Sequence, residues 1–508
     1  MARLLGLDFG TGGVRAGVFD LELCTMLGES EERYPTRHPH PGWAEQSPVD
    51  LWEALGKATR RLLGDLDSPE IAGISVATTA STVVVCKRDG APLHPALLWM
   101  DCRAAVEADR TAASRHPVMA YSGGSDAAEW LVPKAMWFAA HEPELYASAE
   151  VICECIDYVN FRLTGRWVGS RMNATCKWNY DSVARRFAED LYAEFGVPDL
   201  AGKLPRSIFP VGAPIERLSA GAAAHLGLSS RPIVAQGGID AHIGMVGADT
   251  MAPGELLMIG GTSTVQLFQL ARETPVDGFW GPYPHALVDD HWLVEAGQVS
   301  AGSVLSWLSR DMFGLDDARL DNLCREAAAL PVGGAGILSL DYFMGNRTPY
   351  RDPLLRGAFL GLSLGHDRAA LYRAAVEGVA LASANVLKRM GELGVECRRV
   401  VSSGGYARNP IWLKATVDAM GLPMQMLPDV NLTILGAAAC AATGAGLAND
   451  LFEAAKAVAQ PSVVVDPDPA AHELYRELLS EYREATELLR PLMRRLAARQ
   501  LEGVRRVV

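Results

Sequence analysis

Two stretches of the chain share one pattern of apolar and polar positions. In each, an apolar run leads into a turn rich in glycine and threonine, and a second apolar run follows. The first covers residues 4–20, with a Gly-Thr-Gly-Gly turn at 10–13; the second covers 255–268, with a Gly-Gly-Thr-Ser turn at 260–263. Clustered glycines supply the positive φ values of a tight connection, so each stretch predicts a β-hairpin. The repetition predicts two related halves that clamp one ligand between them.

The turns of both hairpins suit a phosphate. Glycines let backbone N–H groups approach an anion closely, and Thr11 adds a hydroxyl donor. Asp8 would repel an anion that it faced alone, so we expect it to hold a hydrated Mg²⁺ that screens the phosphates. One such motif is equally compatible with an ordinary hairpin carrying a surface Asp, and the second copy favours the phosphate interpretation. The sequence has no GxxxxGK[ST] loop, so phosphate binding is assigned to the hairpins.

Between and after the hairpins, the pattern alternates strands with helices. Ser47 and Pro48 predict a capped helix that runs towards Leu63, and residues 71–86 form a β-rich run. Apolar residues at helical spacing predict a core helix over 368–387. Residues 278–283 and 341–353 are predicted loops. The chain is therefore expected to be of the α/β class.

Hydroxyl side chains gather at the end of the β-rich run, where Thr79 and Ser81 are found. A buried strand does not normally concentrate hydroxyls unless they meet a polar partner, and a sugar is one such partner. A hydroxyl ladder on a half-exposed strand explains the composition equally well.

Two further segments carry candidate sugar ligands. Asp101 and Arg103 are two residues apart on an extended stretch and project to one side, where they line a pocket or form a surface ion pair. Lys177 and Trp178 are either a hydroxyl donor with a stacking wall or a solvated lysine with a core indole.

A third candidate carboxylate follows an apolar strand at residues 233–239. Asp240 stands after a double glycine, near the start of a helix of small residues. A helix N-terminus stabilises the charged form of a carboxylate, which alone accounts for an Asp at this place. A hydroxyl that attacks a phosphoryl group must lose its proton, and Asp240 could accept it. His242, two residues further on, faces away and is expected to be structural.

Composition narrows the class of protein. The chain has 508 residues, 49% hydrophobic and 21% charged, which predicts a soluble protein of about two to four domains. A net charge of −13 disfavours a nucleic-acid or anionic-membrane partner. Nine scattered cysteines, of which Cys153 and Cys155 are expected in buried packing, indicate reduced thiols. With no leader pattern and no apolar run of about 18 residues, we expect a cytoplasmic protein.

Taken together, these motifs resemble the FGGY carbohydrate kinase family of the actin-like ATPase superfamily. The resemblance covers nearly the whole chain, including Val400 to Pro410, which is similar to the adenosine motif, and the small-residue helix around 435–439. It implies two actin-like (ribonuclease H-like) α/β domains with a nucleotide and sugar cleft between them. We place the boundary near Thr250, giving domains 1–249 and 250–508.

The resemblance also implies roles for particular residues. Asp240 would be the general base, and Asp8 with Asp240 would hold Mg²⁺. The residues implied on the ATP side are Thr11, Gly12, Gly13, Arg15, Gly261, Thr262, Ser263, Gly404, Gly405 and Asn409. Those implied on the acceptor side are Thr79, Ser81, Asp101, Arg103, Lys177 and Asp240.

The acceptor implied is a ketopentose. The segment 79–83 and the Cys-Lys-Trp-Asn-Tyr string at 176–180 are similar to the D-ribulokinase branch, so D-ribulose is the first expectation. Ala80 and Thr82 depart from that branch and keep L-ribulose, xylulose, glycerol and tetritols such as erythritol open. The partners expected are ATP, a sugar and, as a homodimer, a second copy of the chain. A rival from another class is a sugar sensor or actin-type ATPase without kinase activity, against which Asp8 and Asp240 stand.

Overall fold

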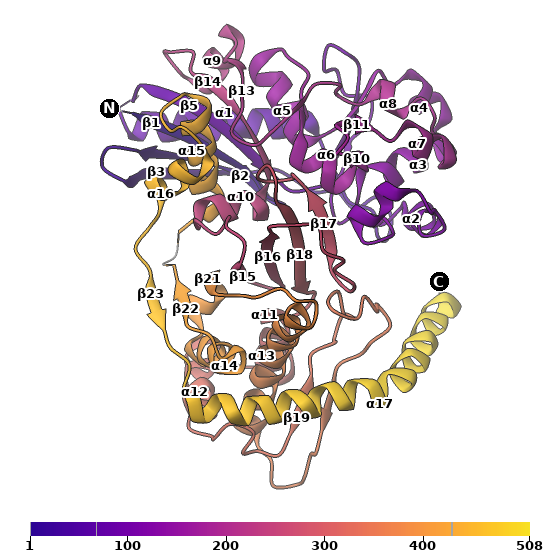
Figure 1. Cartoon of the computed structure of the whole chain (residues 1–508), viewed down its shortest axis with the longest axis vertical. Coiled ribbons are helices and arrows are strands. Elements are labelled where there is room, and N and C mark those ends of the chain that lie inside the picture. Colours follow the sequence, from indigo (N-terminus) through magenta and orange to yellow (C-terminus); the bar gives the residue numbers. More distant parts are fainter. Residues whose placement is uncertain (1, 68, 428–429, 508) are drawn as a thin grey trace.

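Two lobes, each built on a mixed β-sheet flanked by helices, make up the structure (Figure 1). This computed structural model describes residues 2–67, 69–427 and 430–507, with side chains up to residue 500. Every helix in these described ranges is too short or too polar to span a bilayer.

The sheet of the first lobe has six strands in the order β13-β14-β5-β1-β2-β3. The first predicted hairpin is confirmed, because β1 and β2 pair antiparallel around the turn at 10–13. The positive φ values predicted for its glycines are wrong, since Gly10, Gly12 and Gly13 are not among the glycines with positive φ. Strand β5 lies parallel to β1 on one side and to β14 on the other. The strands are β1 (Arg3–Phe9), β2 (Gly13–Asp20), β3 (Thr25–Arg33), β5 (Ile71–Thr78), β13 (Pro214–Arg217) and β14 (Ile233–Ile239).

The seven-stranded sheet of the second lobe repeats this plan, with the order β17-β18-β16-β15-β21-β22-β23. Its hairpin β15–β16 is antiparallel, and β21 lies parallel to β15 as β5 does to β1. The predicted relation between the two halves is thus confirmed in strand order. The strands are β15 (Glu255–Gly260), β16 (Thr264–Leu270), β17 (Trp280–Pro284), β18 (Trp292–Gln298), β21 (Arg399–Gly404), β22 (Met424–Met426) and β23 (Val463–Val465).

Two helices of small residues join the lobes, α10 (Asp240–Gly247) and α15 (Leu432–Gly444). Their backbones approach so closely that a Cβ on Gly436 would lie 2.0 Å from the carbonyl oxygen of Ile243. The other face of α15 covers β1, where a Cβ on Gly6 would lie 2.5 Å from the carbonyl oxygen of Ile434. In space α15 therefore belongs to the first lobe although it follows Thr250, and the division of the chain near Thr250 stays a prediction.

An insertion beside the first sheet carries a four-stranded sheet in the order β4-β7-β6-β8. The run predicted over 71–86 is two strands, because the chain leaves β5 at Thr78 and enters β6 in this second sheet. The insertion comprises β4 (Glu45–Gln46), β6 (Val83–Cys86), β7 (Ala96–Leu97), α2 (Ala105–Thr111), η1 (Pro117–Ser122), α3 (Leu131–His141), α4 (Pro143–Ser148), β8 (Val151–Glu154), β9 (Gly169–Ser170), α6 (Arg171–Lys177), β10 (Tyr180–Asp181), β11 (Arg186–Phe187), α7 (Glu189–Glu194), α8 (Leu200–Lys203) and β12 (Ile208–Phe209).

The predicted helices form with small changes in length. Ser47 caps α1 (Pro48–Asp65), accepting a hydrogen bond from the Asp50 N–H, and the core helix is α13 (Arg368–Glu392). The predicted loop at 278–283 is wrong in part, because Trp280–Pro284 pairs with β18 as the edge strand β17. The remaining elements are α5 (Cys155–Thr164), α9 (Ala220–Leu226), α11 (Gly302–Ser306), a π-helical turn (Trp307–Met312), α12 (Asp317–Ala328), β19 (Leu338–Leu340), β20 (Ala358–Leu360), η3 (Gly405–Arg408), α14 (Pro410–Met420), α16 (Leu451–Val458) and α17 (Pro469–Val507).

Candidate active site

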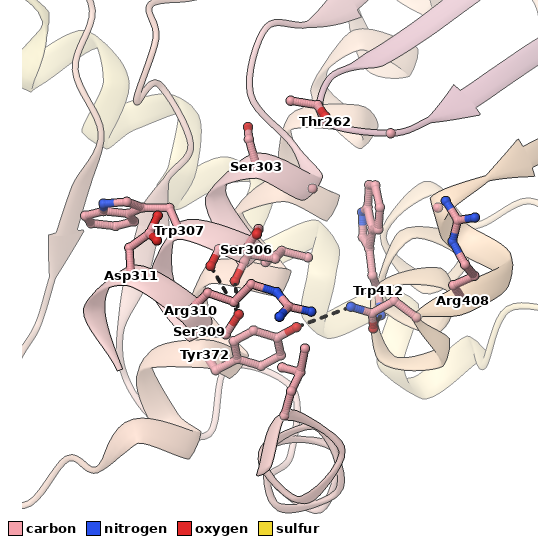
Figure 2. A pocket seen from close by; sticks show the side chains of 16 residues that line it. Thr262, Ser303, Ser306, Trp307, Ser309, Arg310, Asp311, Tyr372, Arg408 and Trp412 are labelled. Atoms are coloured by element: carbon pink, nitrogen blue, oxygen red, sulfur yellow. Dashed lines mark hydrogen bonds between the residues drawn. The ribbon is translucent and has the colours of Figure 1, made fainter. Parts of the chain in front are cut away.

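A cavity of about 750 Å³ lies beside the second hairpin turn, in the second lobe. Four residues predicted from separate motifs meet in its wall: Gly261 and Thr262 from the turn, and Gly405 and Asn409 from the segment after β21. The start of α11, the π-helical turn, Tyr372 and Trp412 complete the wall (Figure 2). We call this space the nucleotide-side cavity. Ser263 is not among the residues that line it.

Backbone hydrogen bonds fix the second turn against α11. The Gly261 N–H donates to the Ser263 carbonyl at 2.8 Å, and the N–H groups of Ala301 and Ser303 donate to the Thr262 carbonyl at 3.0 and 3.1 Å. Gly404 closes the same corner with φ +84°, where a Cβ would lie 2.3 Å from the Gly260 carbonyl oxygen. Only glycine fits there.

Two buried polar atoms in this wall lack a partner within the described structure: the Ser303 Oγ and the Trp412 Nε1. Because buried donors and acceptors are normally paired, such atoms indicate a missing ligand or water. Asn409 differs, since its amide is already engaged: its oxygen accepts the Trp412 N–H at 3.2 Å and its nitrogen donates to the Tyr372 hydroxyl at 3.2 Å. Its predicted contact with adenine stays a prediction.

A second cavity of about 610 Å³, here the middle cavity, lies between the two sheets' hairpins and α15. Asp8, Arg15 and Asp240 line it, so both predicted carboxylates face one space. Arg408 lines this cavity and the nucleotide-side cavity alike. The two cavities are thus adjacent, and the exposed side chain of Arg408 lies at their border.

The pKa values of the two carboxyl groups lie close to neutral pH. Burial raises the pKa of Asp8 to about 6, and Arg15, whose Nη1 is 3.7 Å from the Asp8 Oδ2, opposes this shift. Burial, and next the charge of Asp8, raise the pKa of Asp240 to about 7. Asp240 is the first residue of α10, as predicted near a helix start, and its Oδ1 accepts the Ala241 N–H at 2.7 Å. Two like charges in one buried site each disfavour ionisation of the other.

The first turn lies beside the middle cavity, which Gly10 lines. The Thr11 hydroxyl accepts a hydrogen bond from the Trp99 Nε1 at 2.9 Å, which leaves its own proton free for another acceptor. Gly12 is exposed and Gly13 is buried. None of Thr11, Gly12 and Gly13 lines a described cavity, and their contact with phosphate stays a prediction.

A third cavity, of about 140 Å³, is formed between the insertion and the second lobe. Its wall combines indole rings with charged groups, and we call it the acceptor-side cavity. Lys177 lines it as predicted: its Nζ lies 3.8 Å from the Glu295 Oε2 and 4.7 Å from the Trp130 ring centroid. The wall consists of Ala80, Trp99, Ala127, Glu129, Trp130, Lys177, Trp280, Glu295 and Arg347.

Glu295, on β18, stays ionised in this wall. Burial would raise its pKa, but the charge of Lys177, with a further contribution from Arg347, outweighs burial and leaves the pKa below its ordinary value. The Nε2 of His242 lies 3.8 Å from the Glu295 Oε2. Burial lowers the pKa of His242 to about 4, so the imidazole is neutral. Glu295 therefore offers a charged acceptor and Lys177 a charged donor to hydroxyl groups.

The other predicted acceptor residues are engaged with protein groups. Ser81 donates to the Glu154 Oε1 at 2.9 Å, and Thr79 shares a hydrogen bond with Thr82. Asp101 and Arg103 form an ion pair at 2.8 Å that is buried, where the sequence offered a pocket or a surface pair. None of Thr79, Ser81, Asp101 and Arg103 is among the residues that line the acceptor-side cavity, and their contact with sugar stays a prediction.

Trp178 is a core indole, which was one of the two predicted alternatives. It is fully buried and donates its Nε1 to the Glu154 Oε1 at 2.9 Å. Glu154 also accepts a hydrogen bond from Asn173 at 2.8 Å, which joins β8 to α6 within the insertion. Cys153 and Cys155, which flank Glu154, lie in buried packing as predicted.

The charged residues of the cavities that were not predicted include Glu295, Arg347 and Arg408. The sequence does indicate a role for Glu295, because a lone acid in the apolar run 292–298 needs a polar partner if the run is a buried strand. Arg408 follows the double glycine at 404–405 by three residues and was read only as part of a motif. Arg347 lies in the loop predicted over 341–353, and from the same loop Arg351 binds across the lobes, donating to the Gly123 carbonyl at 2.7 Å.

Known proteins resemble the chain over nearly its whole length. A ribulokinase from Mycolicibacterium smegmatis is 29% identical over 554 aligned positions, covering 99% of this chain and 97% of the relative. A xylulose kinase from Staphylococcus epidermidis is 27% identical, covering 94% and 95%. The crystal structure of a xyloylose kinase from Brucella ovis superposes with a TM-score of 0.88 at 28% identity, covering 96% of this chain and 100% of that one.

Two family profiles divide the chain between them. Residues 3–247 match the N-terminal domain of the FGGY family of carbohydrate kinases, and residues 256–445 match its C-terminal domain. Together with the two-lobed α/β fold, these matches confirm the family resemblance and the predicted fold class. The chain belongs to the FGGY family of carbohydrate kinases, enzymes that use ATP to phosphorylate small-molecule sugars.

Proposed function

We propose that this kinase transfers the γ-phosphoryl group of ATP to a hydroxyl of a ketopentose, with D-ribulose as the first candidate and D-ribulose 5-phosphate as its product. The arrangement of the three cavities supports this proposal. Asp8 and Asp240 face a space that borders the nucleotide-side cavity at Arg408. On the other side, α10 carries Asp240 in the middle cavity and His242 beside Glu295 of the acceptor-side cavity. The proposal rests on this one observation, that Asp240 lies between the nucleotide-side and acceptor-side cavities.

In the proposed reaction, Asp240 takes the proton of the attacking hydroxyl. Its raised pKa of about 7 suits a base that works near neutral pH. Lys177 and Glu295 orient the acceptor through its other hydroxyl groups, and the indoles of Trp130 and Trp280 cover its apolar edges. Arg408 faces the transferring phosphoryl group from the border of two cavities and offsets its charge.

The middle cavity fits a divalent cation. Two carboxylates that repel each other and share one space, Asp8 buried and Asp240 half-buried, are unfavourable alone, and a hard cation bound by their oxygens relieves that repulsion. We propose Asp8 and Asp240 as the residues that would hold Mg²⁺, which supplies charge neutralisation for the phosphates when bound. Nine free cysteines, most of them wholly or partly buried, support a reducing compartment, and we place the kinase in the cytoplasm.

Xylulose is the second candidate acceptor. Relatives named xylulose kinase and relatives named ribulokinase match this chain at similar identity, 27% and 29%. The acceptor-side cavity of about 140 Å³ is the size of a small polyol and gives no preference between two pentuloses. L-Ribulose, glycerol and erythritol complete the set of acceptors to be compared.

The test is ATP consumption by the full chain with Mg²⁺ and each acceptor in turn, repeated with Asp240→Asn. We expect the highest kcat/KM with D-ribulose, and a fall in kcat of about 10²- to 10⁴-fold in the variant. A preference for xylulose or another polyol overturns the acceptor and retains the kinase. Sugar-dependent turnover that survives Asp240→Asn overturns the assignment of the base. ATP turnover that no sugar stimulates favours the sensor or actin-type ATPase.

A further inference from the structure

Arg351 reaches from the second lobe to the insertion of the first. It lies in the polar loop 341–353, and its guanidinium donates to the Gly123 carbonyl at 2.7 Å and to the Ser125 hydroxyl at 3.1 Å. Gly123 leaves room for this contact, because a Cβ there would lie 2.9 Å from the Arg351 Nη1. Arg351 is itself half-buried. One arginine thus ties a loop of the second lobe to the insertion.

The backbone of Arg351 indicates that its side chain is needed at this place. Its φ is +47°, in the left-handed region that favours glycine and that other residues seldom adopt. An arginine in this conformation is strained unless its contacts compensate for the strain. The structure offers three such contacts: the two hydrogen bonds to the insertion and a contact with Trp280.

The contact with Trp280 leads to the acceptor-side cavity. The guanidinium carbon of Arg351 lies 4.0 Å from the Trp280 ring centroid, within the range of a cation–π contact. Trp280 in turn contacts Trp130, with ring centroids 5.1 Å apart, and the Nζ of Lys177 lies 4.7 Å from the Trp130 centroid. The four side chains form a row of cation, indole, indole and cation. The last three line the acceptor-side cavity, whereas Arg351 is not among its lining residues.

The ring of Trp280 depends on such face contacts for its orientation. Its indole N–H has no hydrogen-bond partner among the residues that the structure describes. Trp280 stands on the edge strand β17 opposite Glu295, and the register of this pairing shifts just after it. A cavity of about 460 Å³ has Gly123, Gly281 and Arg351 in its wall, so packing between the edge strand and the insertion is incomplete there. Arg351 bridges this gap.

We propose that Arg351 is a positioning residue for the sugar: it holds the indole of Trp280 against Trp130, so that the aromatic wall of the acceptor-side cavity is in place before the sugar binds. This inference rests on the proposed function, in which that cavity binds the acceptor. Because Arg351 lies outside the cavity, it acts on the sugar through Trp280. Loss of a preformed wall weakens binding in the ground state and the transition state alike, which raises the KM for the sugar and leaves kcat nearly unchanged.

The first test is steady-state kinetics of the full chain with D-ribulose and, in parallel, with xylulose. Arg351→Ala should raise the KM for the sugar about tenfold and leave kcat and the KM for ATP within about twofold. Arg351→Lys keeps a cation but loses the planar fork that makes two hydrogen bonds, so it should recover part of this loss. Arg356→Ala is the matched control: Arg356 also donates to backbone carbonyls, of Pro353 at 3.0 Å and Leu355 at 2.8 Å, and its removal should leave all three constants unchanged.

The second test asks whether Arg351 acts through Trp280. Trp280→Leu should raise the KM for the sugar by itself. Arg351→Ala added to it should raise this KM by less than about twofold further, because the contact that it removes is already absent. The emission that wild type loses on Trp280→Leu reports on this indole without any sugar. In Arg351→Ala that emission should shift to longer wavelength and be quenched more strongly by acrylamide.

The outcomes separate this inference from the proposed function. Unchanged Trp280 emission in Arg351→Ala overturns the positioning role, whichever sugar proves to be the acceptor. Changed emission with an unchanged KM for the sugar overturns the link to sugar binding, as do effects of Arg351→Ala and Trp280→Leu that add in full. If the proposed function fails, no sugar stimulates ATP consumption by the wild-type chain, and the emission still decides whether Arg351 holds the ring.

Discussion

The two halves of the molecule share a strand plan but divide the chemistry unequally. In each, an antiparallel hairpin lies beside a parallel strand, and an N–H at the start of the turn bonds a carbonyl at its end: Gly10 to Gly13 at 3.0 Å and Gly261 to Ser263 at 2.8 Å. The register of the hairpins makes Asp8 on β1 equivalent to Ile259 on β15. Both side chains line the middle cavity. One half thus brings an acid to this space where the other brings an alkyl group.

The difference teaches how one fold serves two tasks. The first half holds the carboxylates that suit a cation and a proton transfer, and the second half surrounds the nucleotide-side cavity with hydroxyl, amide and indole groups together with Arg310, Asp311 and Arg408. Asp8 and Asp240 alone would repel the phosphates of the nucleotide, whereas a cation bound between them attracts these phosphates. Changes at equivalent positions of the two halves should therefore have unequal effects.

Among the changes that compare the two halves, the largest effect is expected from Asp8→Asn. Loss of one proposed cation ligand should lower kcat about 100-fold and raise the Mg²⁺ concentration needed for half-maximal rate. The melting temperature should not fall, because the substitution removes a buried charge that repels Asp240. Steady-state rates across a Mg²⁺ titration, together with thermal melts, measure both outcomes.

The matched variant for that experiment is Ile259→Asn, which places the same amide at the equivalent position of the second hairpin. It should leave the half-saturating Mg²⁺ concentration unchanged, even where the buried amide lowers the melting temperature. An equal shift in Mg²⁺ dependence in both variants would contradict the division of tasks between the halves.

The next effect in size concerns the glycines near the two turns. Gly404→Ala forces a Cβ to 2.3 Å from the Gly260 carbonyl at φ +84°, so it should cost about 1–3 kcal/mol of unfolding free energy and raise the KM for ATP. Gly12→Ala in the first turn meets nothing within 4 Å and should leave stability nearly unchanged. Chemical denaturation of both variants tests the contrast, and equal losses would refute it.

A smaller effect is expected from Ser303→Ala. The Ser303 Oγ is buried beside the second turn without a protein partner, so its removal should leave the melting temperature unchanged or slightly higher. If the hydroxyl binds nucleotide, the KM for ATP should rise about 2- to 10-fold. The KM for the sugar should not change. Ser309→Ala is the control in the same wall, because its hydroxyl already donates to the Leu305 carbonyl at 2.7 Å.

The hairpins and the relation between the two halves could be predicted from the sequence because each depends on a local pattern. Glycine turns between apolar runs specify a hairpin without help from distant residues, and a carboxylate after such a strand is visible in the printed sequence. Asp240 was found for the same reason, at the junction of an apolar strand with a small-residue helix. Gly261 and Gly405 of the nucleotide-side cavity could be predicted because each belongs to a local motif.

The acceptor-side cavity was harder to predict because its wall is assembled from distant segments. Trp130, Lys177, Glu295 and Arg347 come from four separate elements or loops, and their convergence depends on how the insertion meets the second lobe. The hydroxyls at the strand end are polar, which predicts a ligand, yet Ser81 is bound to Glu154 and Thr79 to Thr82. A buried hydrogen-bond partner 73 residues away leaves no signal in a local pattern.

The smallest effect on catalysis is expected from an acid in the second half that lies outside the cavities, Asp341. Burial raises its pKa to about 7, against hydrogen bonds from Tyr482 and Gln298 that lower it. Since an unfolded Asp titrates near pH 4, the folded state binds the extra proton between about pH 4 and 7. Its stabilising contribution is therefore complete below pH 4 and is lost as the pH rises to 7, by up to about 1.4 kcal/mol per unit.

Asp341→Asn should remove this slope, so that the difference in unfolding free energy between wild type and variant declines from pH 4 to 7. Denaturant titrations at several pH values measure it. The Mg²⁺ dependence of the rate should be unchanged, in contrast to Asp8→Asn, because Asp341 faces Tyr482 and Gln298 and lines none of the three cavities. A shifted Mg²⁺ dependence in Asp341→Asn would mean that acids in both halves affect cation binding. That result would contradict the assignment of the cation ligands to the first half alone.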